Sequence, residues 1–201
     1  MQASFVIARL RGLELPALRL PATTGGLVDL RELAAGLLVL YVYPQMAGPD
    51  VQLPAAWDDT PGARGCTPQS CGFRDARGRL AELGVTVAGL SAQAHEQQLE
   101  AATRLELGFP LLADPGFGLQ AELGLPTFTI DDAAFYRRVT LVAHRGRIAK
   151  VFYPVDPPAA NAAEVLAWLE DRSLTESTIL RPWTMNESRR SGPSTASTPA
   201  A

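Results

Sequence analysis

Apolar side chains run without interruption from Leu37 to Val42, and Tyr43 extends the run. A strand that is covered on both faces has this pattern, whereas a half-exposed strand alternates apolar and polar positions. A second run of the same kind, VTVAGL, covers 85–90. We therefore predict two buried strands, at 37–43 and at 85–90.

An apolar stripe with helical spacing lies between these two runs and ends at Gly84, a typical helix stop. The stripe begins after Thr67 and Pro68, which fit an N-cap and the first residue of a helix. Its members are Phe73, Ala76, Leu80 and Leu83.

The rest of the pattern predicts three more helices and two more strands. Helices are expected at 93–107 and 118–123, and Asn161 is expected to cap a last helix. Residues 138–154 are typical of two strands joined by a tight turn at His144, Arg145 and Gly146. The apolar positions of the last helix are Val165, Leu166, Trp168 and Leu169.

The resulting order is β-α-β-α-β-β-α. It implies parallel strands joined by crossover helices, followed by an antiparallel hairpin. A thioredoxin-like fold has this order. We therefore expect an α/β protein with a central mixed β-sheet flanked by helices.

The character of the sequence changes near Arg172, after which Ser, Thr and Pro dominate. This composition is typical of a flexible segment. We predict one domain over 1–172 and a flexible C-terminal tail over 173–201. Three apolar residues of the tail could dock on the domain or on a second subunit: Ile179, Leu180 and Trp183.

Charge and composition narrow the choice of partners and of compartment. Lys and Arg number 18 against 21 Asp and Glu, so no positive field attracts nucleic acid or an anionic membrane. The longest apolar run is far shorter than the roughly 20 residues that cross a bilayer. Arg9 and Arg11 interrupt the N-terminal apolar stretch, unlike a secretory signal, so we expect a cytoplasmic protein.

Cys66 and Cys71 are the only cysteines in the sequence. In one regular helix their Cα atoms would lie roughly 8 to 9 Å apart, whereas a disulfide needs less than about 7 Å. We therefore expect a reduced helical form and an oxidised form in which the first helical turn has melted. Cys66 lies at the positive end of the helix, which favours a thiolate, and Cys71 is suited to attack a sulfenic acid formed on Cys66.

Two other interpretations of the thiol pair remain at this point. Both cysteines could be small buried core residues, as free cysteines often are. A metal site is disfavoured, because this spacing is not a common zinc spacing and only His95 and His144 remain to complete a ligand shell. We expect no metal and no organic cofactor.

The stretch that runs from LLVLYVYP at 37–44 to WDDTPGARGCTPQSCGFRDARGRLAELGVTVAGLSAQ at 57–93 resembles a peroxiredoxin of the AhpC/TSA superfamily. The resemblance is to the bacterioferritin-comigratory or Q type, an atypical two-cysteine group with the motif T-P-G-C-T-x-x-x-C-x-F-R-D. Weaker similarity at 109–125 and 136–155 extends it over about 13–170. It implies a peroxidatic Cys66, a resolving Cys71 and an active-site Arg138, with Arg137 on the other face of the strand.

The chain also departs from this family near the thiols. Ala63 stands where the family has a Thr or Ser three residues before the peroxidatic cysteine. Thr60 is our candidate for the missing hydroxyl, with Thr67 and Arg64 as alternatives. Gln69 replaces a glutamate of many relatives, and residues 46–57 form an insertion.

The resemblance implies a thiol-dependent peroxidase that acts on hydrogen peroxide or organic hydroperoxides. A Cys66–Cys71 disulfide would be recycled by thioredoxin or a glutaredoxin-like reductant, and the protein would be a monomer or a homodimer. The alternative is a thiol-disulfide carrier or redox sensor, which a cis Pro126 in GLPTFTI would favour. A non-catalytic domain with two buried thiols is a third interpretation.

Overall fold

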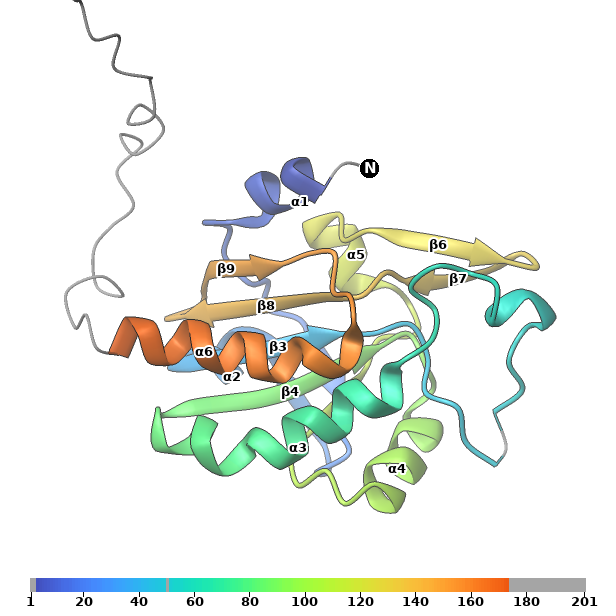
Figure 1. Cartoon of the computed structure of the whole chain (residues 1–201), viewed down its shortest axis with the longest axis horizontal. Coiled ribbons are helices and arrows are strands. Elements are labelled where there is room, and N and C mark those ends of the chain that lie inside the picture. Colours follow the sequence, from blue (N-terminus) through green and yellow to red (C-terminus); the bar gives the residue numbers. More distant parts are fainter. Residues whose placement is uncertain (1–2, 50, 174–201) are drawn as a thin grey trace, which may run out of the picture.

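The computed structural model describes residues 3–49 and 51–173. A five-stranded mixed sheet forms its centre (Figure 1). β3 (Leu37–Val42) pairs in parallel with β4 (Val85–Ser91) and antiparallel with β8 (Val139–His144). β5 (Leu111–Ala113) and β9 (Arg147–Phe152) complete the order β5-β4-β3-β8-β9. The predicted mixed sheet flanked by helices is confirmed.

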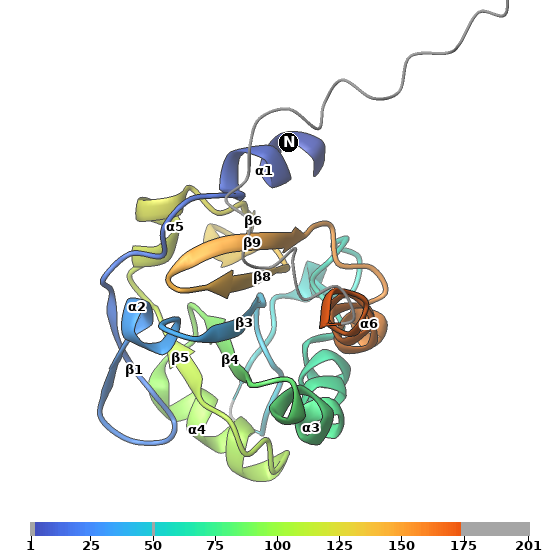
Figure 2. The same ribbon diagram turned by 90° about the vertical axis from the view of Figure 1, so that its left-hand side faces the viewer.

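Helices cover both faces of this sheet (Figure 2). One face packs against α3 (Cys66–Glu82), α4 (His95–Arg104) and α6 (Asn161–Ser173). The other face packs against α1 (Ala3–Leu10), α2 (Leu30–Leu33) and α5 (Gly118–Leu123). Successive residues of β3 point to opposite faces, so both faces need apolar side chains there, and this explains the continuous apolar run.

Two short hairpins and the short strand β5 were not predicted. β5 has three residues, and β1 (Arg19–Pro21) with β2 (Leu27–Asp29) forms a small hairpin. β6 (Thr127–Ile130) and β7 (Ala133–Tyr136) form another hairpin outside the main sheet. Runs of three or four residues are too short to show a period of two.

The β6–β7 hairpin and the 46–57 insertion form a small core of their own. The insertion contains a 3₁₀ helix, η1 (Ala55–Trp57), and the ring centre of Trp57 lies 5.1 Å from that of Phe135. Trp57 is also in contact with Phe128, which pairs with Phe135 across the hairpin. This core therefore joins the insertion to the strand that leads to Arg138.

The predicted hairpin near residue 145 is confirmed, since His144 pairs with Arg147 and the two residues between them have positive φ. Asn161 does not cap the last helix. It is the first residue of α6, preceded by the 3₁₀ helix η2 (Pro158–Ala160), and its side chain is fully buried. That side chain makes its polar contacts with other elements and not with the backbone N–H groups of α6.

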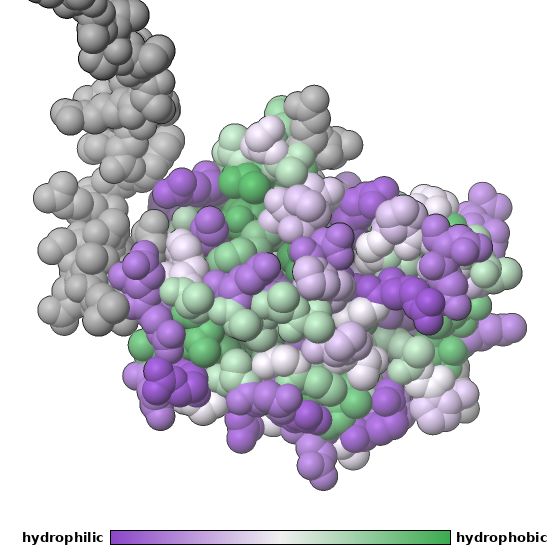
Figure 3. Space-filling view, in the orientation of Figure 1, coloured by the Kyte–Doolittle hydropathy of each residue, from purple (hydrophilic) through white to green (hydrophobic). Residues whose placement is uncertain are grey.

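The exposed face in Figure 3 mixes hydrophilic and hydrophobic residues. No helix within the described residues combines the length and the apolar composition that crossing a membrane requires. The predicted tail begins one residue too early, because Ser173 still belongs to α6, and its other residues, with Ile179, Leu180 and Trp183, lie outside the described residues.

Candidate active site

Cys66 is the first residue of α3, and Gly65 is its N-cap. Gly65 has a φ of 100°, in the left-handed region that favours glycine. A Cβ atom there would lie 2.6 Å from Pro158 Cγ, so packing also excludes a side chain. The predicted cap at Thr67 is therefore wrong. Thr67 and Pro68 lie within the first turn, where proline has no helical hydrogen bond to lose.

The sulfur of Cys66 is buried beneath the end of this helix. The residue is 3 % exposed, and its Sγ atom lies 3.7 Å from the carbonyl oxygen of Ala63. No side chain caps this end of α3, so the partial positive charge of its unpaired N–H groups acts at Cys66. The sulfur therefore lies beside partial positive charge.

Arg138 brings a full positive charge to the same sulfur. Its Nη2 atom donates to Cys66 Sγ at 3.2 Å and to the carbonyl oxygen of Arg64 at 3.0 Å. The carbonyl oxygens of Gly62 and Ala63 lie 3.5 Å from the same nitrogen. A hydrogen bond from a cation to sulfur stabilises a thiolate more than a neutral thiol.

Arg137 lies elsewhere, although it is adjacent in sequence. Its guanidinium carbon lies 5.3 Å from the centre of the Phe128 ring, and its backbone N–H donates to the carbonyl oxygen of Pro126. The alternation expected of an extended segment therefore separates the two arginines. Arg138 points to the thiol, and Arg137 points to the β6–β7 hairpin.

A cavity of about 170 Å³ opens over Cys66. Its walls come from the segment that follows β3, from the insertion and from the start of α3. The apolar part of the wall includes Leu53 and Trp57 of the insertion, with Ala63 and Pro68 beside the sulfur. A small substrate with an apolar group therefore has space next to Cys66.

The hydroxyl beside Cys66 belongs to Thr67, which lines the cavity. Thr60 does not line it, and its Oγ1 donates to the carbonyl oxygen of Ala56 at 2.7 Å. Arg64 lies at the rim, where it forms an exposed ion pair of 3.3 Å with Asp58. Of the three candidates for the missing hydroxyl contact, the structure brings Thr67 and Arg64 to the cavity and leaves Thr60 outside it.

Cys71 is half-buried in the second turn of α3, and both cysteines are free thiols. Because 66–82 is continuous helix, the two Cα atoms have the helical separation of roughly 8 to 9 Å. The pair cannot form a disulfide until the first turn opens.

The phenol groups of Tyr41 and Tyr43 near Cys66 carry no charge, so the charged group in contact with the sulfur is that of Arg138. Burial raises the pKa of Tyr41 and of Tyr43, so both phenols are protonated at neutral pH. Tyr41 donates from its hydroxyl to Ser70 Oγ at 3.0 Å. Among the described residues, no carboxylate oxygen lies within 4.0 Å of an Arg138 nitrogen.

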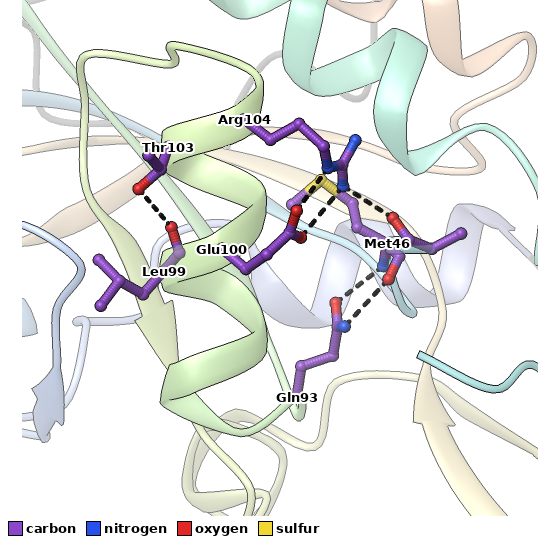
Figure 4. A network of polar contacts seen from close by, with 7 residues as sticks. Met46, Gln93, Leu99, Glu100, Thr103 and Arg104 are labelled. Carbon is purple, nitrogen blue, oxygen red and sulfur yellow. Dashed lines mark hydrogen bonds and ion pairs between the residues drawn. The ribbon is translucent and has the colours of Figure 1, made fainter. Parts of the chain in front are cut away.

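The segment after β3 is fixed to the region of α4 (Figure 4). Gln93 accepts from the backbone N–H of Met46 at 2.7 Å and donates to the carbonyl oxygen of Met46 at 3.1 Å. Arg104 donates to the carbonyl oxygen of Ala47 at 2.9 Å and pairs with Glu100. The predicted helix at 93–107 begins later, at His95, and the side chain of Gln93 holds the segment after β3. One wall of the cavity is fixed in this way.

Three polar residues behind the site were not predicted to contribute to it. Gln69 accepts from Arg138 Nη1 and donates to Asn161 Oδ1 at 2.9 Å. Thr140 also donates to Asn161 Oδ1, at 2.7 Å. A buried polar residue inside an apolar pattern is the signal that could have identified them.

Two features bear on the alternatives. The cis peptide bonds of the described residues precede Pro154 and Pro157, so the bond before Pro126 is trans, and the feature that would favour a thiol-disulfide carrier is absent. Within the described residues, no group of three or more His, Cys, Asp or Glu side chains is arranged to hold a metal ion.

The chain matches the family model Redoxin over residues 10–166. Peroxiredoxin Bcp of Escherichia coli is 29 % identical over 165 residues, which cover 79 % of this chain and 94 % of that protein. A putative peroxiredoxin bcp of Coxiella burnetii is 33 % identical over 103 residues, 51 % of this chain and 58 % of that protein. The chain thus spans little more than half the length of this second relative.

Among solved structures, the chain is similar to peroxidoxin BcpB of Mycobacterium tuberculosis. That structure is 26 % identical, with a TM-score of 0.63, and the match covers 80 % of this chain and 96 % of the other. The five-stranded mixed sheet with helices on both faces is thus a thioredoxin-like arrangement.

Proposed function

This chain belongs to the Redoxin family and is a peroxiredoxin of the bacterioferritin-comigratory or Q type, and from that premise we propose that Cys66 reduces peroxides. One observation carries the proposal: Arg138 Nη2 lies 3.2 Å from Cys66 Sγ at the base of an open cavity. A thiolate stabilised in this way is a nucleophile beside a space for substrate.

In the first step the Cys66 thiolate attacks the terminal oxygen of a hydroperoxide. An S–O bond forms as the O–O bond breaks, and the leaving oxygen takes up a proton to give water or an alcohol. Cys66 becomes a sulfenic acid. Arg138 and the N–H groups at the start of α3 donate toward the oxygen on which negative charge develops, and Thr67 is the nearest side-chain hydroxyl on the cavity wall.

In the second step the first turn of α3 opens and the Cys71 thiolate attacks the sulfenic sulfur. A disulfide forms and the sulfenic oxygen leaves as water. An external dithiol protein of the thioredoxin or glutaredoxin kind then reduces the disulfide by exchange. This cycle needs no metal and no organic cofactor.

The substrates of the proposed reaction are hydrogen peroxide and organic hydroperoxides. Liquid water occupies about 30 Å³ per molecule, so a cavity of about 170 Å³ holds more than one hydrogen peroxide molecule. The apolar wall formed by Leu53 and Trp57 offers a place for an organic group. A location in the cytoplasm, where thiols are kept reduced, is part of the same proposal.

The test is peroxide consumption with a thioredoxin regeneration system, followed by mass spectrometry of the cysteines. Cys66→Ser should abolish peroxide reduction. Cys71→Ser should still form a sulfenic acid on Cys66 but no intramolecular disulfide. A thiol-disulfide carrier would instead reduce disulfides with little peroxide turnover, and activity retained in Cys66→Ser would refute the proposal.

A further inference from the structure

Arg138 belongs to a network of buried hydrogen bonds that joins α3, α6 and β8. In this network Arg138 donates to Gln69, Gln69 donates to Asn161, and Thr140 donates to the same atom of Asn161. Gln69, Thr140 and Asn161 are fully buried, and Arg138 is 4 % exposed. Water therefore cannot replace a lost partner without a change of structure.

Arg138 fixes the direction of every hydrogen bond in this network. A guanidinium only donates, so Gln69 must present its carbonyl oxygen to Arg138. The amide nitrogen of Gln69 then needs an acceptor, and Asn161 Oδ1 supplies it at 2.9 Å. If the Gln69 amide turned over, two donors would face each other and Arg138 would lose its bond.

The backbone holds Asn161 firmly enough for this task. Asn161 begins α6, directly after η2, whose Pro158 packs against Gly65 beside the thiol. Thr140 lies in β8 two residues after Arg138, so the two side chains share one side of the extended chain. The acceptor is thus fixed relative to both ends of the Arg138–Cys66 contact.

The amide nitrogen of Asn161 shows that the oxygen Oδ1 is the atom through which this residue acts. Asn161 Nδ2 is buried and has no hydrogen-bond partner among the described residues. An unpaired buried donor is costly, so packing alone would favour an apolar side chain here. What Asn161 supplies that an apolar residue lacks is an oxygen that accepts from Gln69 and Thr140.

We propose that Asn161 is a positioning residue for peroxide reduction, which holds the Gln69 amide so that its carbonyl oxygen keeps Arg138 against the Cys66 sulfur. The inference rests on the proposed function of Cys66. Asn161 touches neither the sulfur nor the substrate, so its effect must pass through Gln69 and Arg138.

The experiment measures the rate at which hydrogen peroxide oxidises Cys66 in the full chain, in a Cys71→Ser background that isolates this step. Asn161→Leu removes the acceptor and should slow oxidation by about tenfold, the usual size of a lost hydrogen bond to a charged network. Asn161→Asp keeps an oxygen in the same place and should stay within about threefold of the background rate. Aspartate also keeps the shape of asparagine, so the coupling to Gln69 is what separates the acceptor role from the filling of space.

A double-mutant cycle tests whether the effect passes through Gln69. Gln69→Leu should also slow oxidation, and adding Asn161→Leu to it should cause no further loss. Gln52→Leu, at an exposed glutamine, is the matched control. Losses that multiply in the double variant would overturn the inference.

Separate controls test whether the Asn161 variant folds and whether Cys66 reacts with peroxide at all. In the chain with both cysteines, reduction of a preformed Cys66–Cys71 disulfide by dithiothreitol should be unchanged by Asn161→Leu, because the network has already opened. If this variant does not fold, Thr140→Val replaces it, with an expected slowing of about threefold, and a background rate would then overturn the inference. Failure of Cys66 to react in the Cys71→Ser background would refute the proposed function itself, whereas a background rate in folded Asn161→Leu would refute only the inference.

Discussion

Arg138 carries its charge into the interior with no carboxylate of the described residues beside it. Three backbone carbonyl oxygens and Gln69 accept its hydrogen bonds, and the sulfur of Cys66 is the group that becomes an anion. A buried cation needs such compensation, because transfer of an unpaired charge out of water is costly. Gln69 is neutral, so it adds no negative charge and leaves this compensation to the sulfur of Cys66.

Replacing Arg138 by lysine should separate charge from geometry. An ammonium keeps the charge but cannot donate to Gln69 and to the sulfur at once from one planar group. We expect Arg138→Lys to slow oxidation of Cys66 by about a hundredfold, the size of a lost donor to a developing charge. Stopped-flow measurement with hydrogen peroxide gives this rate.

Arg137→Lys is the matched control for that measurement, since Arg137 lies over the Phe128 ring. Its rate should stay within about twofold of the unaltered protein. Disulfide reduction should be unaffected in both variants. Equal slowing by the two substitutions would contradict the role of Arg138.

For single residues, the sequence predicted the thiols and Arg138 better than the residues that hold them in place. The positions of Cys66 and Arg138 followed from local patterns and from the resemblance to peroxiredoxins. The Gln69–Asn161 contact joins α3 to α6, far apart in the chain, and no local pattern indicates it. The choice among Thr60, Thr67 and Arg64 stayed open, because the motif T-P-G does not determine the path of residues 63–65.

The first turn of α3 is the element whose stability opposes disulfide formation. Opening it breaks the contacts of Gln69 with Arg138 and Asn161 and the contact of Ser70 with Tyr41. Each buried group left without a partner costs about 1 to 3 kcal/mol. The disulfide would close a short loop and stabilise the protein by roughly 2 kcal/mol.

The lost contacts outweigh the loop closure, so the oxidised protein should be less stable than the reduced one. Differential scanning calorimetry should show a lower melting temperature after one equivalent of peroxide. The Cys71→Ser variant, which forms no disulfide, should show a smaller decrease. A higher melting temperature for the oxidised protein would contradict the opening of α3.

The insertion supplies Leu53 and Trp57 to the apolar wall of the cavity, and the β6–β7 hairpin packs against Trp57. Trp57 is held there by Phe128 and Phe135 and is 4 % exposed, so its ring is fixed before substrate arrives. Trp57→Ala should slow oxidation by cumene hydroperoxide roughly tenfold, because an apolar contact to the organic group is lost. Oxidation by hydrogen peroxide should change by less than about twofold.

Trp168→Ala is a suitable control for this substitution. Trp168 packs edge to face on Phe152, on α6, and does not line the cavity. It should leave the ratio of the two peroxide rates unchanged. If Trp57→Ala also leaves the ratio unchanged, the wall does not contact the substrate.

The whole molecule combines a rigid sheet with a thiol site at one helix end. β3 is paired on both edges and buried by helices on both faces. The amides of Val39 and Leu40 should therefore exchange with solvent only through global unfolding. The amides of Gln69 and Ser70 should exchange faster, through opening of one turn.

Native-state hydrogen exchange measured by NMR checks this difference. Exchange of Gln69 and Ser70 should have a weaker dependence on denaturant than exchange of β3, as expected for a local opening. Equal dependence would mean that α3 opens only when the whole domain unfolds. Such a protein could not form its disulfide by a local change.

The sequence predicted the large elements of this architecture because their patterns are local. β3, β4 and the β8–β9 hairpin have runs of six or seven residues, and α5 was predicted with its observed bounds. The small hairpins have strands of three or four residues, and their pairing depends on contacts such as Trp57 with Phe135. The start of α3 was misplaced because Gly65 adopts its conformation against Pro158.

The buried charge of Arg138 has a consequence for the timing of the proposed reaction cycle. In the proposed cycle, oxidation converts an anionic sulfur into a neutral sulfenic acid, so the guanidinium loses its counterion at the moment of turnover. Burial of the cation then becomes less favourable, and the free-energy difference between the closed and open states of α3 decreases. Reaction with peroxide thus favours the opening of α3. Before that reaction the first turn of α3 stays closed.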